Sequence, residues 1–247
     1  MTTLLFNTMK PKVVGHVDIN PNRLASWHDG HFDTIDEIIE REPQFHQATP
    51  DYIEMINHGC LTHMILEQLR EIIRGRRQHT FNTANDYHYL QIDVEVHRLK
   101  PGWYPCIPGW HCNFITRDEK ENIQPDRKKD EKTRHWMVVL GENITPTQFL
   151  RTRNVTIKPK KSPQWNVVNE KINKLIEAEK VEPFQVTPGD IIMFRGNELY
   201  RGLAAENRCW RYLFRASLFP KNHLCHRPNG THGEIRTQQQ VFLDVSS

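Results

Sequence analysis

The segment Pro188-Gly189-Asp190-Ile191-Ile192-Met193-Phe194 predicts a turn followed by a buried strand. A tight corner is expected at Tyr200-Arg201-Gly202, and a second strand at Trp210-Arg211-Tyr212-Leu213-Phe214-Arg215-Ala216-Ser217. Because side chains alternate between the two faces of a strand, Arg211 and Arg215 share one face. The segment therefore predicts two strands of a β-rich core, with a pair of arginines that face the same way.

The composition is that of a folded chain of moderate charge. The chain has 247 residues, and we expect a single domain over residues 1–247. Hydrophobic residues make up 37% of it and the mean hydropathy is −0.68, but 11 Phe and 6 Trp supply large side chains for a core. The net charge of +3 is too small to indicate nucleic-acid binding by itself. Since no apolar stretch approaches about 18 residues, we expect no membrane association.

Cysteine usage and the N-terminus both bear on the cellular compartment. The cysteines are Cys60, Cys106, Cys112, Cys209 and Cys225. They form no C-x-x-C pair and their number is odd, which fits a reducing compartment better than a disulfide framework. Leu4-Leu5-Phe6 is too short an apolar run for a signal peptide. We therefore expect a cytoplasmic protein.

Residues 1–85 are expected to be mainly helical. Asp33–Glu40 has the pattern of a short amphipathic helix. Thr49-Pro50 is a strong helix start, because a capping hydroxyl is followed by proline at the first helical position. Apolar residues then recur at helical spacing to about Arg74, which predicts one continuous helix that tolerates Gly59.

From residue 88 the hydrophobic period becomes that of a strand. Leu90, Ile92, Val94 and Val96 alternate with polar residues, as in a half-buried strand. Further strands are expected at 135–140, 147–152 and 154–158, with a second helix after Ser162-Pro163. Residues 117–134 are almost all polar or charged and predict a loop insertion, and residues 221–247 predict an irregular tail. Helices followed by many short strands predict a mainly β fold with some α, a sandwich or barrel over 86–220 with the N-terminal helices packed on it.

Three separated segments resemble the iron(II)/2-oxoglutarate-dependent oxygenase superfamily. They are His111-Cys112-Asn113, the turn and strand that lead from Pro188 to Tyr200-Arg201-Gly202, and the strand from Trp210 to Ser217. The resemblance covers residues 88–219 and implies a double-stranded β-helix core, which is a jelly-roll or cupin-like fold. In that family a His-x-Asp pair and a distant histidine hold iron(II), and an arginine about ten residues later binds 2-oxoglutarate.

The resemblance places the metal ligands of the family at His111, Asn113 and Tyr200, the 2-oxoglutarate arginine at Arg211 and a substrate-binding arginine at Arg215. Two of these positions depart from the pattern. Asn113 offers a neutral amide where the family has a carboxylate, and Tyr200 offers a phenol of ordinary pKa about 10 where the family has a histidine. His111 alone does not make an iron site.

Each of these residues also has an ordinary structural interpretation. His111 would be a hydrogen-bonded histidine at a strand start, Tyr200 a tyrosine packed at a corner, and the arginines surface residues. A surface position for the arginines is less favoured, because the apolar Leu213 lies between them on the same face. If that face lines a barrel interior, each arginine needs an anionic partner. We therefore favour an anion-binding pocket.

These features predict an oxygenase-like protein that has lost metal-dependent catalysis, holds no cofactor, and binds a small anion such as a dicarboxylate through Arg211 and Arg215. The first alternative is an active non-haem iron 2-oxoglutarate-dependent hydroxylase. It would use iron(II) and 2-oxoglutarate as cofactors in an atypical site of His111, Asn113 and Tyr200, or one that uses another histidine such as His97 or His135.

The second alternative is a nucleic-acid or protein interaction module. Nucleic acid would contact the basic groups within 74–77, 117–134 and 158–161, and a protein partner would contact the N-terminal helices. A zinc site in the tail is a separate possibility, although its residues lack the paired spacing of structural zinc ligands. Those residues are His223, Cys225, His226 and His232.

Overall fold

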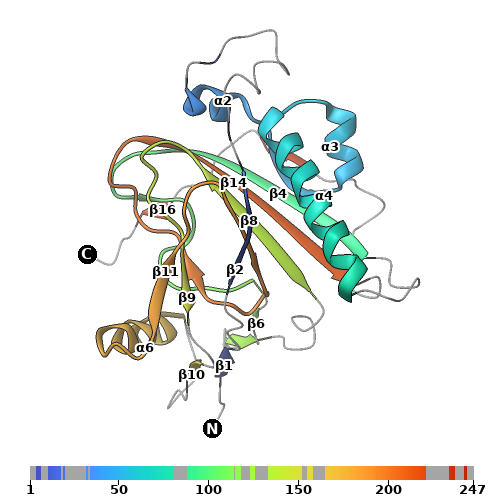
Figure 1. Ribbon diagram of the computed structural model, residues 1–247. Helices are drawn as coiled ribbons and strands as arrows, with labels where there is room; N and C mark the ends of the chain where they lie inside the picture. The colour runs from blue at the N-terminus through green and yellow to red at the C-terminus, as the bar shows by residue number, and fades with distance from the viewer. Residues whose placement is uncertain are drawn as a thin grey trace.

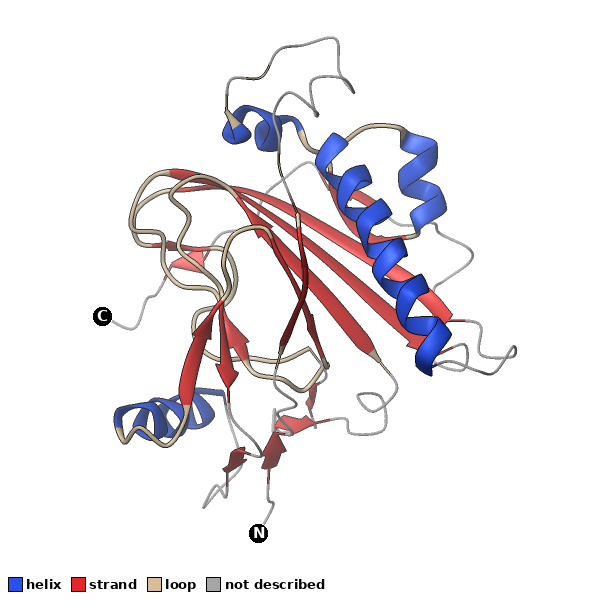
Figure 2. Ribbon diagram, viewed as in Figure 1, coloured by secondary structure: helices blue, strands red, loops and turns tan. Residues whose placement is uncertain are grey.

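Antiparallel strands are the main regular structure of the described chain (Figure 1, Figure 2). The computed structural model describes residues 4–6, 11–17, 19, 32, 34–80, 88–113, 115–117, 123–125, 133–151, 155–157, 165–220, 234–236 and 242–243. Within these residues the strands form one large sheet and several small ones.

The large sheet has the strand order β15-β3-β4-β14-β8-β12-β2. Its strands are β2 (Lys12–His16), β3 (Gln44–Ala48), β4 (His88–Leu99), β8 (Arg134–Leu140), β12 (Asp190–Phe194), β14 (Cys209–Pro220) and β15 (Glu234–Arg236). β4 and β14 pair along their whole length, and β8 lies between β14 and β12. The segment from Pro188 to Ser217 therefore supplies two strands of this sheet, as predicted: β14 at its centre and β12 next to the edge strand β2.

A three-stranded sheet of order β11-β9-β13 packs against one face of the large sheet. Its strands are β9 (Gln148–Arg151), β11 (Glu182–Gln185) and β13 (Tyr200–Arg201). Phe149 and Tyr200 from this sheet join Val139, Phe194 and Leu213 from the large sheet in one buried cluster. Two sheets packed face to face, with helices added, confirm the predicted mainly β, jelly-roll-like fold.

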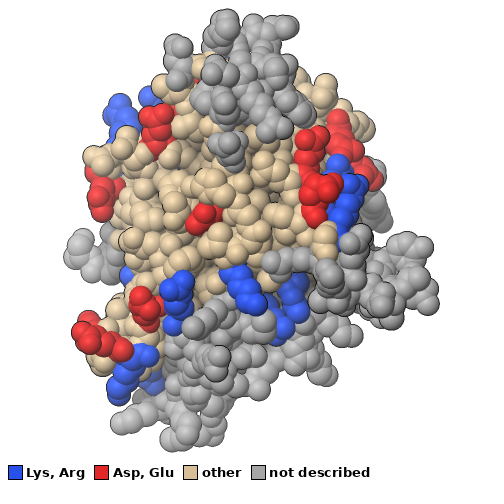
Figure 3. Space-filling model, in the orientation of Figure 1, with Lys and Arg blue, Asp and Glu red and all other residues tan. Residues whose placement is uncertain are grey.

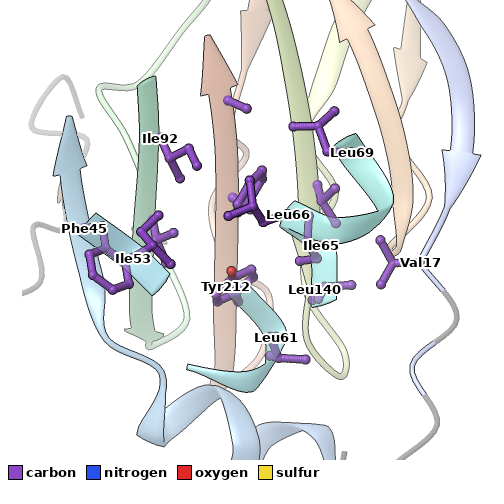
Figure 4. Close-up of a cluster of buried hydrophobic side chains, with 14 of the residues drawn as sticks. Val17, Phe45, Ile53, Leu61, Ile65, Leu66, Leu69, Ile92, Leu140 and Tyr212 are labelled. Atoms are coloured by element: carbon purple, nitrogen blue, oxygen red, sulfur yellow. The ribbon is translucent and has the colours of Figure 1, made fainter. Parts of the chain in front are cut away.

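Helices cover the opposite face of the large sheet (Figure 1). They are α2 (Ile35–Arg41), α3 (Pro50–Ile56) and α4 (Cys60–Thr80). Figure 4 shows Leu61, Leu66 and Leu69 of α4 against the sheet residues Ile92 and Tyr212. Burial of such side chains stabilises the fold by about 1.5–3 kcal/mol each, so this face is the main hydrophobic core.

The continuous helix predicted from Thr49-Pro50 to Arg74 is wrong, because the chain turns between α3 and α4. Asn57 has the left-handed φ of 52° and Gly59 has a φ of 94°. A Cβ atom at Gly59 would lie 2.7 Å from Glu42 Oε2. Gly59 is thus required at the turn, and the apolar spacing continues across it because both helices pack on the same sheet.

Glu42 joins the start of α4 to the sheet. Its carboxylate accepts hydrogen bonds from Leu61 N at 2.8 Å and from Thr62 Oγ1 at 2.8 Å, and Thr62 Oγ1 lies 2.9 Å from the Tyr212 hydroxyl on β14. Burial raises the pKa of Glu42 despite these donors. A residue distant in sequence therefore satisfies the first turn of the helix.

Other predictions are confirmed in part. The strands expected at 147–152 and 154–158 are β9 and β10 (Val155–Ile157), and the second helix is α6 (Trp165–Glu177). The insertion and the tail are not wholly irregular, because the described parts contain paired strands. Those pairs are β6 (Ile115–Arg117) with β7 (Ile123–Pro125), β15 with β3, and β16 (Phe242–Leu243) with β5 (Trp103–Tyr104). Likewise β1 (Leu4–Phe6), β2 and β3 make the first 85 residues less helical than predicted.

Two of the strands that were not predicted, β2 and β15, lie at the edges of the large sheet. β15 extends the open edge at β3, and β2 extends the edge at β12. Free backbone groups at an edge recruit short segments with little apolar alternation of their own. Among the described residues, no helix has the length and apolar character needed to cross a membrane.

Candidate functional site

A cavity of about 440 Å³ lies between the two sheets and is lined by all five side chains singled out in the sequence. They are His111, Asn113, Tyr200, Arg211 and Arg215. β13 and β14 supply three of them, and the loop before β6 supplies the other two. The structure therefore brings together residues that lie up to about a hundred positions apart.

Backbone pairing holds His111 beside Tyr200. The two residues form an isolated antiparallel bridge, in which His111 N donates to Tyr200 O at 3.0 Å and Tyr200 N donates to His111 O at 2.9 Å. Their rings meet edge to face, with centroids 4.3 Å apart. This bridge places the 111–113 segment and β13 side by side.

The Tyr200 phenol donates a hydrogen bond to Asn113 Oδ1 at 2.6 Å. Tyr200 is only 7% exposed, and burial raises the pKa of its phenol to about 12. The phenol therefore keeps its proton at neutral pH and remains a donor. The two residues that depart from the oxygenase pattern are partners of each other.

A hydrogen bond to the backbone fixes the orientation of the His111 ring. Its Nδ1 atom lies 3.1 Å from the carbonyl oxygen of Gly109. Burial lowers the pKa of His111, although the hydrogen bond to Gly109 opposes that effect. The imidazole is consequently a neutral ring at the cavity wall.

Arg211 is a buried cation with incomplete hydrogen bonding. It is 4% exposed, and its Nη2 donates to Thr147 Oγ1 at 3.0 Å. Its Nε and Nη1 have no hydrogen-bond partner among the described residues. Burial lowers the pKa of the guanidinium, but an arginine stays charged near neutral pH.

Arg215 already has a carboxylate partner within the protein. Its Nη2 donates to Asp93 Oδ2 at 3.0 Å, and Asp93 is also 3.1 Å from His46 Nδ1 and accepts from Gln47 N at 2.9 Å. Burial would raise the pKa of Asp93, but His46 and Arg215 hold it well below its usual range. We expected an anionic partner for Arg215, and the structure shows that Asp93 is that partner.

Sequence reasoning missed the polar face of β4. Asp93 and His97 are 3% and 2% exposed, and Glu95 and His97 line the cavity. Their alternation with apolar residues is the same as that of a solvated strand face. Local sequence does not show that this face is buried. The register of β4 against β14 places Asp93 opposite Arg215, and this pairing is seen only in the structure.

The apolar wall and the other histidines complete the cavity. Trp110, Trp165 and Leu213 lie along it, and Arg201 stacks over the Trp110 ring at 4.4 Å. His97 is one of the lining residues, whereas His135 is not. His135 Nδ1 lies 2.8 Å from Ser217 Oγ, and burial lowers its pKa to about 3.

The residues present do not fit an iron(II) site. A facial triad needs two imidazoles and a carboxylate, but the phenol and the amide at these positions are engaged with each other. Among the described residues, no group of three or more His, Cys, Asp or Glu side chains is arranged to hold a metal. The positive charge of Arg215 lowers the pKa of Tyr200, but burial raises it by more, so the phenol stays protonated.

Most of the residues for which the sequence suggested nucleic-acid or zinc binding lie outside the described residues. Within the stretches 74–77, 117–134 and 158–161 most side chains fall outside the described residues, as do His223, Cys225, His226 and His232 of the tail. On the face in Figure 3, acidic and basic side chains of the described residues both occur. Nucleic-acid binding, a protein partner and a tail zinc site therefore stay predictions.

Comparison with known proteins gives only distant similarities. No family model and no curated relative matches the sequence. The chain is similar to HygX from Streptomyces hygroscopicus, solved with iron bound (TM-score 0.42, 9% identity, 89% of this chain and 82% of that chain). It is also similar to an N-substituted L-amino acid dioxygenase from Burkholderia ambifaria AMMD, in complex with alpha-KG (TM-score 0.33, 10% identity, 82% and 83%). AviO1 from Streptomyces viridochromogenes gives a TM-score of 0.30 at 11% identity, over 80% and 99%. Similarities this low assign neither a family nor an activity.

Proposed function

We propose that this chain binds a small carboxylate, such as a dicarboxylate, without a metal, and that Arg211 is its anchor. The observation that carries the proposal is the state of the Arg211 guanidinium. It lines the cavity, is almost completely buried, and has two nitrogens without a partner among the described residues.

The free-energy cost of burying N–H donors without partners supports an anionic ligand for Arg211. A buried donor that lacks a partner costs about 1–3 kcal/mol, and more when it is charged. A carboxylate lowers that cost because its oxygens accept charge-assisted hydrogen bonds from the guanidinium N–H groups. Thr147 holds Nη2 by one hydrogen bond and so fixes the plane of the fork.

The two arginines are proposed to have different roles. Asp93 neutralises Arg215, so Arg215 positions the β4 and β14 side chains and lends a more distant positive field. Glu95 also lines the cavity and opposes a highly charged anion. The volume of about 440 Å³ falls in the range of small-molecule sites, which are roughly 300–1,000 Å³. A ligand with a carboxylate at one end fits these limits.

We further propose that the chain has an oxygenase-like scaffold without iron-dependent catalysis. The Tyr200–Asn113 hydrogen bond supports this, because it satisfies the two groups that a metal would need. A protonated phenol and a neutral amide bring no negative charge to a dication.

Calorimetric titration tests the proposal. Protein freed of metal by a chelator is titrated with 2-oxoglutarate, and saturable binding is expected. Arg211→Ala should weaken it by about 30-fold or more, since truncating one member of a buried charge pair costs about 2–5 kcal/mol. Arg208→Ala is the matched control, because Arg208 is exposed on the approach to the same strand and should leave affinity unchanged. Absence of heat in the wild type, or equal affinity in Arg211→Ala, would refute the proposal.

A further inference from the structure

His111 presents a free acceptor to the cavity rather than a donor. A carbonyl oxygen can only accept, so the hydrogen bond between Nδ1 and Gly109 O fixes the proton of the neutral ring on Nδ1. Nε2 then carries the lone pair. Among the described residues, the side-chain hydrogen bond of His111 is the one at Nδ1, and the hydroxyl of Tyr200, whose ring contacts the His111 ring, donates to Asn113.

The cavity is thus polarised between two kinds of group. Arg211 offers N–H donors without partners among the described residues, and His111 offers a lone pair. A ligand that satisfies both carries an anionic acceptor and a separate hydrogen-bond donor. An oxo acid has only acceptors near its carboxylate, whereas a hydroxy acid has an O–H group.

We infer that the ligand is a hydroxycarboxylate, with its carboxylate on Arg211 and its hydroxyl donating to Nε2 of His111. This inference rests on the proposed function and narrows its ligand class. It reverses the preference expected of a metal-containing site, where an adjacent carbonyl and carboxylate would chelate the ion. With no metal to coordinate, the carbonyl of an oxo acid would face the His111 lone pair, and two acceptors repel.

Nearby donors restrict where the hydroxyl can lie. Asn113 Nδ2 and Trp110 Nε1 are buried without partners among the described residues, and both residues line the cavity. These two N–H groups favour acceptor atoms of the ligand. The Glu95 carboxylate also lines the cavity and can accept a hydrogen bond, but it repels the ligand carboxylate. His111 Nε2 is therefore the neutral acceptor that we assign to the hydroxyl, and one enantiomer of the hydroxy acid should bind better than the other.

The test compares ligands that differ only at one carbon. Metal-free protein at about pH 8, where a histidine of ordinary or lowered pKa is neutral, is titrated with 2-oxoglutarate and with each enantiomer of 2-hydroxyglutarate. One hydrogen bond gained and one acceptor–acceptor contact avoided predict about tenfold tighter binding of one hydroxy enantiomer. His111→Phe keeps a flat ring beside Tyr200 but removes the lone pair, and it should make the oxo and hydroxy acids bind equally. His111→Gln, whose amide oxygen accepts, should restore part of the preference.

The two proposals fail in different ways. If both ligands bind equally well and binding still depends on Arg211, the hydroxycarboxylate inference is wrong and the proposed function stands. The inference is also wrong if the preference survives in His111→Phe. If neither ligand binds, both proposals fall. A variant that does not fold leaves a direct measurement, because the ¹⁵N resonance of His111 Nε2 in the wild type should be that of an unprotonated ring nitrogen and should shift when 2-hydroxyglutarate is added.

Discussion

Tyr200 and Asn113, which lie 87 residues apart, are joined by a 2.6 Å hydrogen bond from the phenol to the amide oxygen. The sequence resemblance predicts that these two positions correspond to metal ligands of iron oxygenases. The bond gives each of the two side chains a partner. A phenol alone would lack an acceptor in this buried position, and an amide alone would lack a donor.

Removing the phenol hydroxyl should destabilise the protein. Tyr200→Phe leaves Asn113 Oδ1 without its donor and is expected to cost about 1–2 kcal/mol of unfolding free energy. Urea denaturation measures the cost. In an Asn113→Ala background the same change should cost less, with a coupling of about 0.5 kcal/mol or more. Equal costs in the two backgrounds would show that the bond does not stabilise the fold.

Asp93→Ala should be among the more damaging single changes. It leaves the partly buried Arg215 without a carboxylate, and breaking a buried pair costs about 3–5 kcal/mol. The lower end is expected, because the Arg215 side chain is 26% exposed. Glu170→Ala is the control, since Glu170 forms an even shorter pair with Lys174, at 2.6 Å, but both side chains are exposed and the change should affect stability little. Comparable losses for both variants in thermal unfolding would contradict this account of Asp93.

Stability should fall in acid through His135. Burial lowers its pKa to about 3, whereas the unfolded chain has a histidine pKa of about 6.5. Between these values the unfolded state binds a proton that the folded state does not, so stability is retained above about pH 6.5 and is lost as the pH falls. The slope is about 1.4 kcal/mol per pH unit for this one group. His135→Gln should flatten the slope in that window, and an unchanged slope would show that His135 is not responsible.

Restoring both missing ligands should create a metal site. Asn113→Asp together with Tyr200→His supplies the carboxylate and second imidazole beside His111 that a facial triad needs. The double variant is expected to retain about one equivalent of iron(II) or cobalt(II) after anaerobic loading and desalting, and each single variant much less. If the double variant stays free of metal, the correspondence of these positions with the family triad is wrong.

The central sheet could be predicted from sequence because its signals are local. The turn before Ile191, the alternation around Ile92 and the parity of Arg211 and Arg215 depend on neighbouring residues only. The meeting of His111, Asn113 and Tyr200 at one cavity was predicted from the resemblance alone. No local pattern contains it, since it depends on pairing across almost ninety residues.

Other features depend on tertiary contacts and were beyond the sequence. The polar side of β4 has the pattern of an exposed face, yet Asp93 is buried and is held by His46, Gln47 and Arg215. Gly59 is compatible with a continuous helix until Glu42 and Pro43 occupy the space beside it. Arg215 required an anion on grounds of burial, but only the register of β4 against β14 shows that Asp93 supplies it.

Metal independence is the central claim, and one paired titration tests it most directly. The wild-type protein is titrated anaerobically with 2-oxoglutarate, once with a chelator present and once with iron(II) loaded. We predict the same affinity in both, with Arg211→Ala weakened in both. Binding that occurs only with iron(II), or that is tightened about tenfold or more by it, would contradict a metal-free carboxylate site.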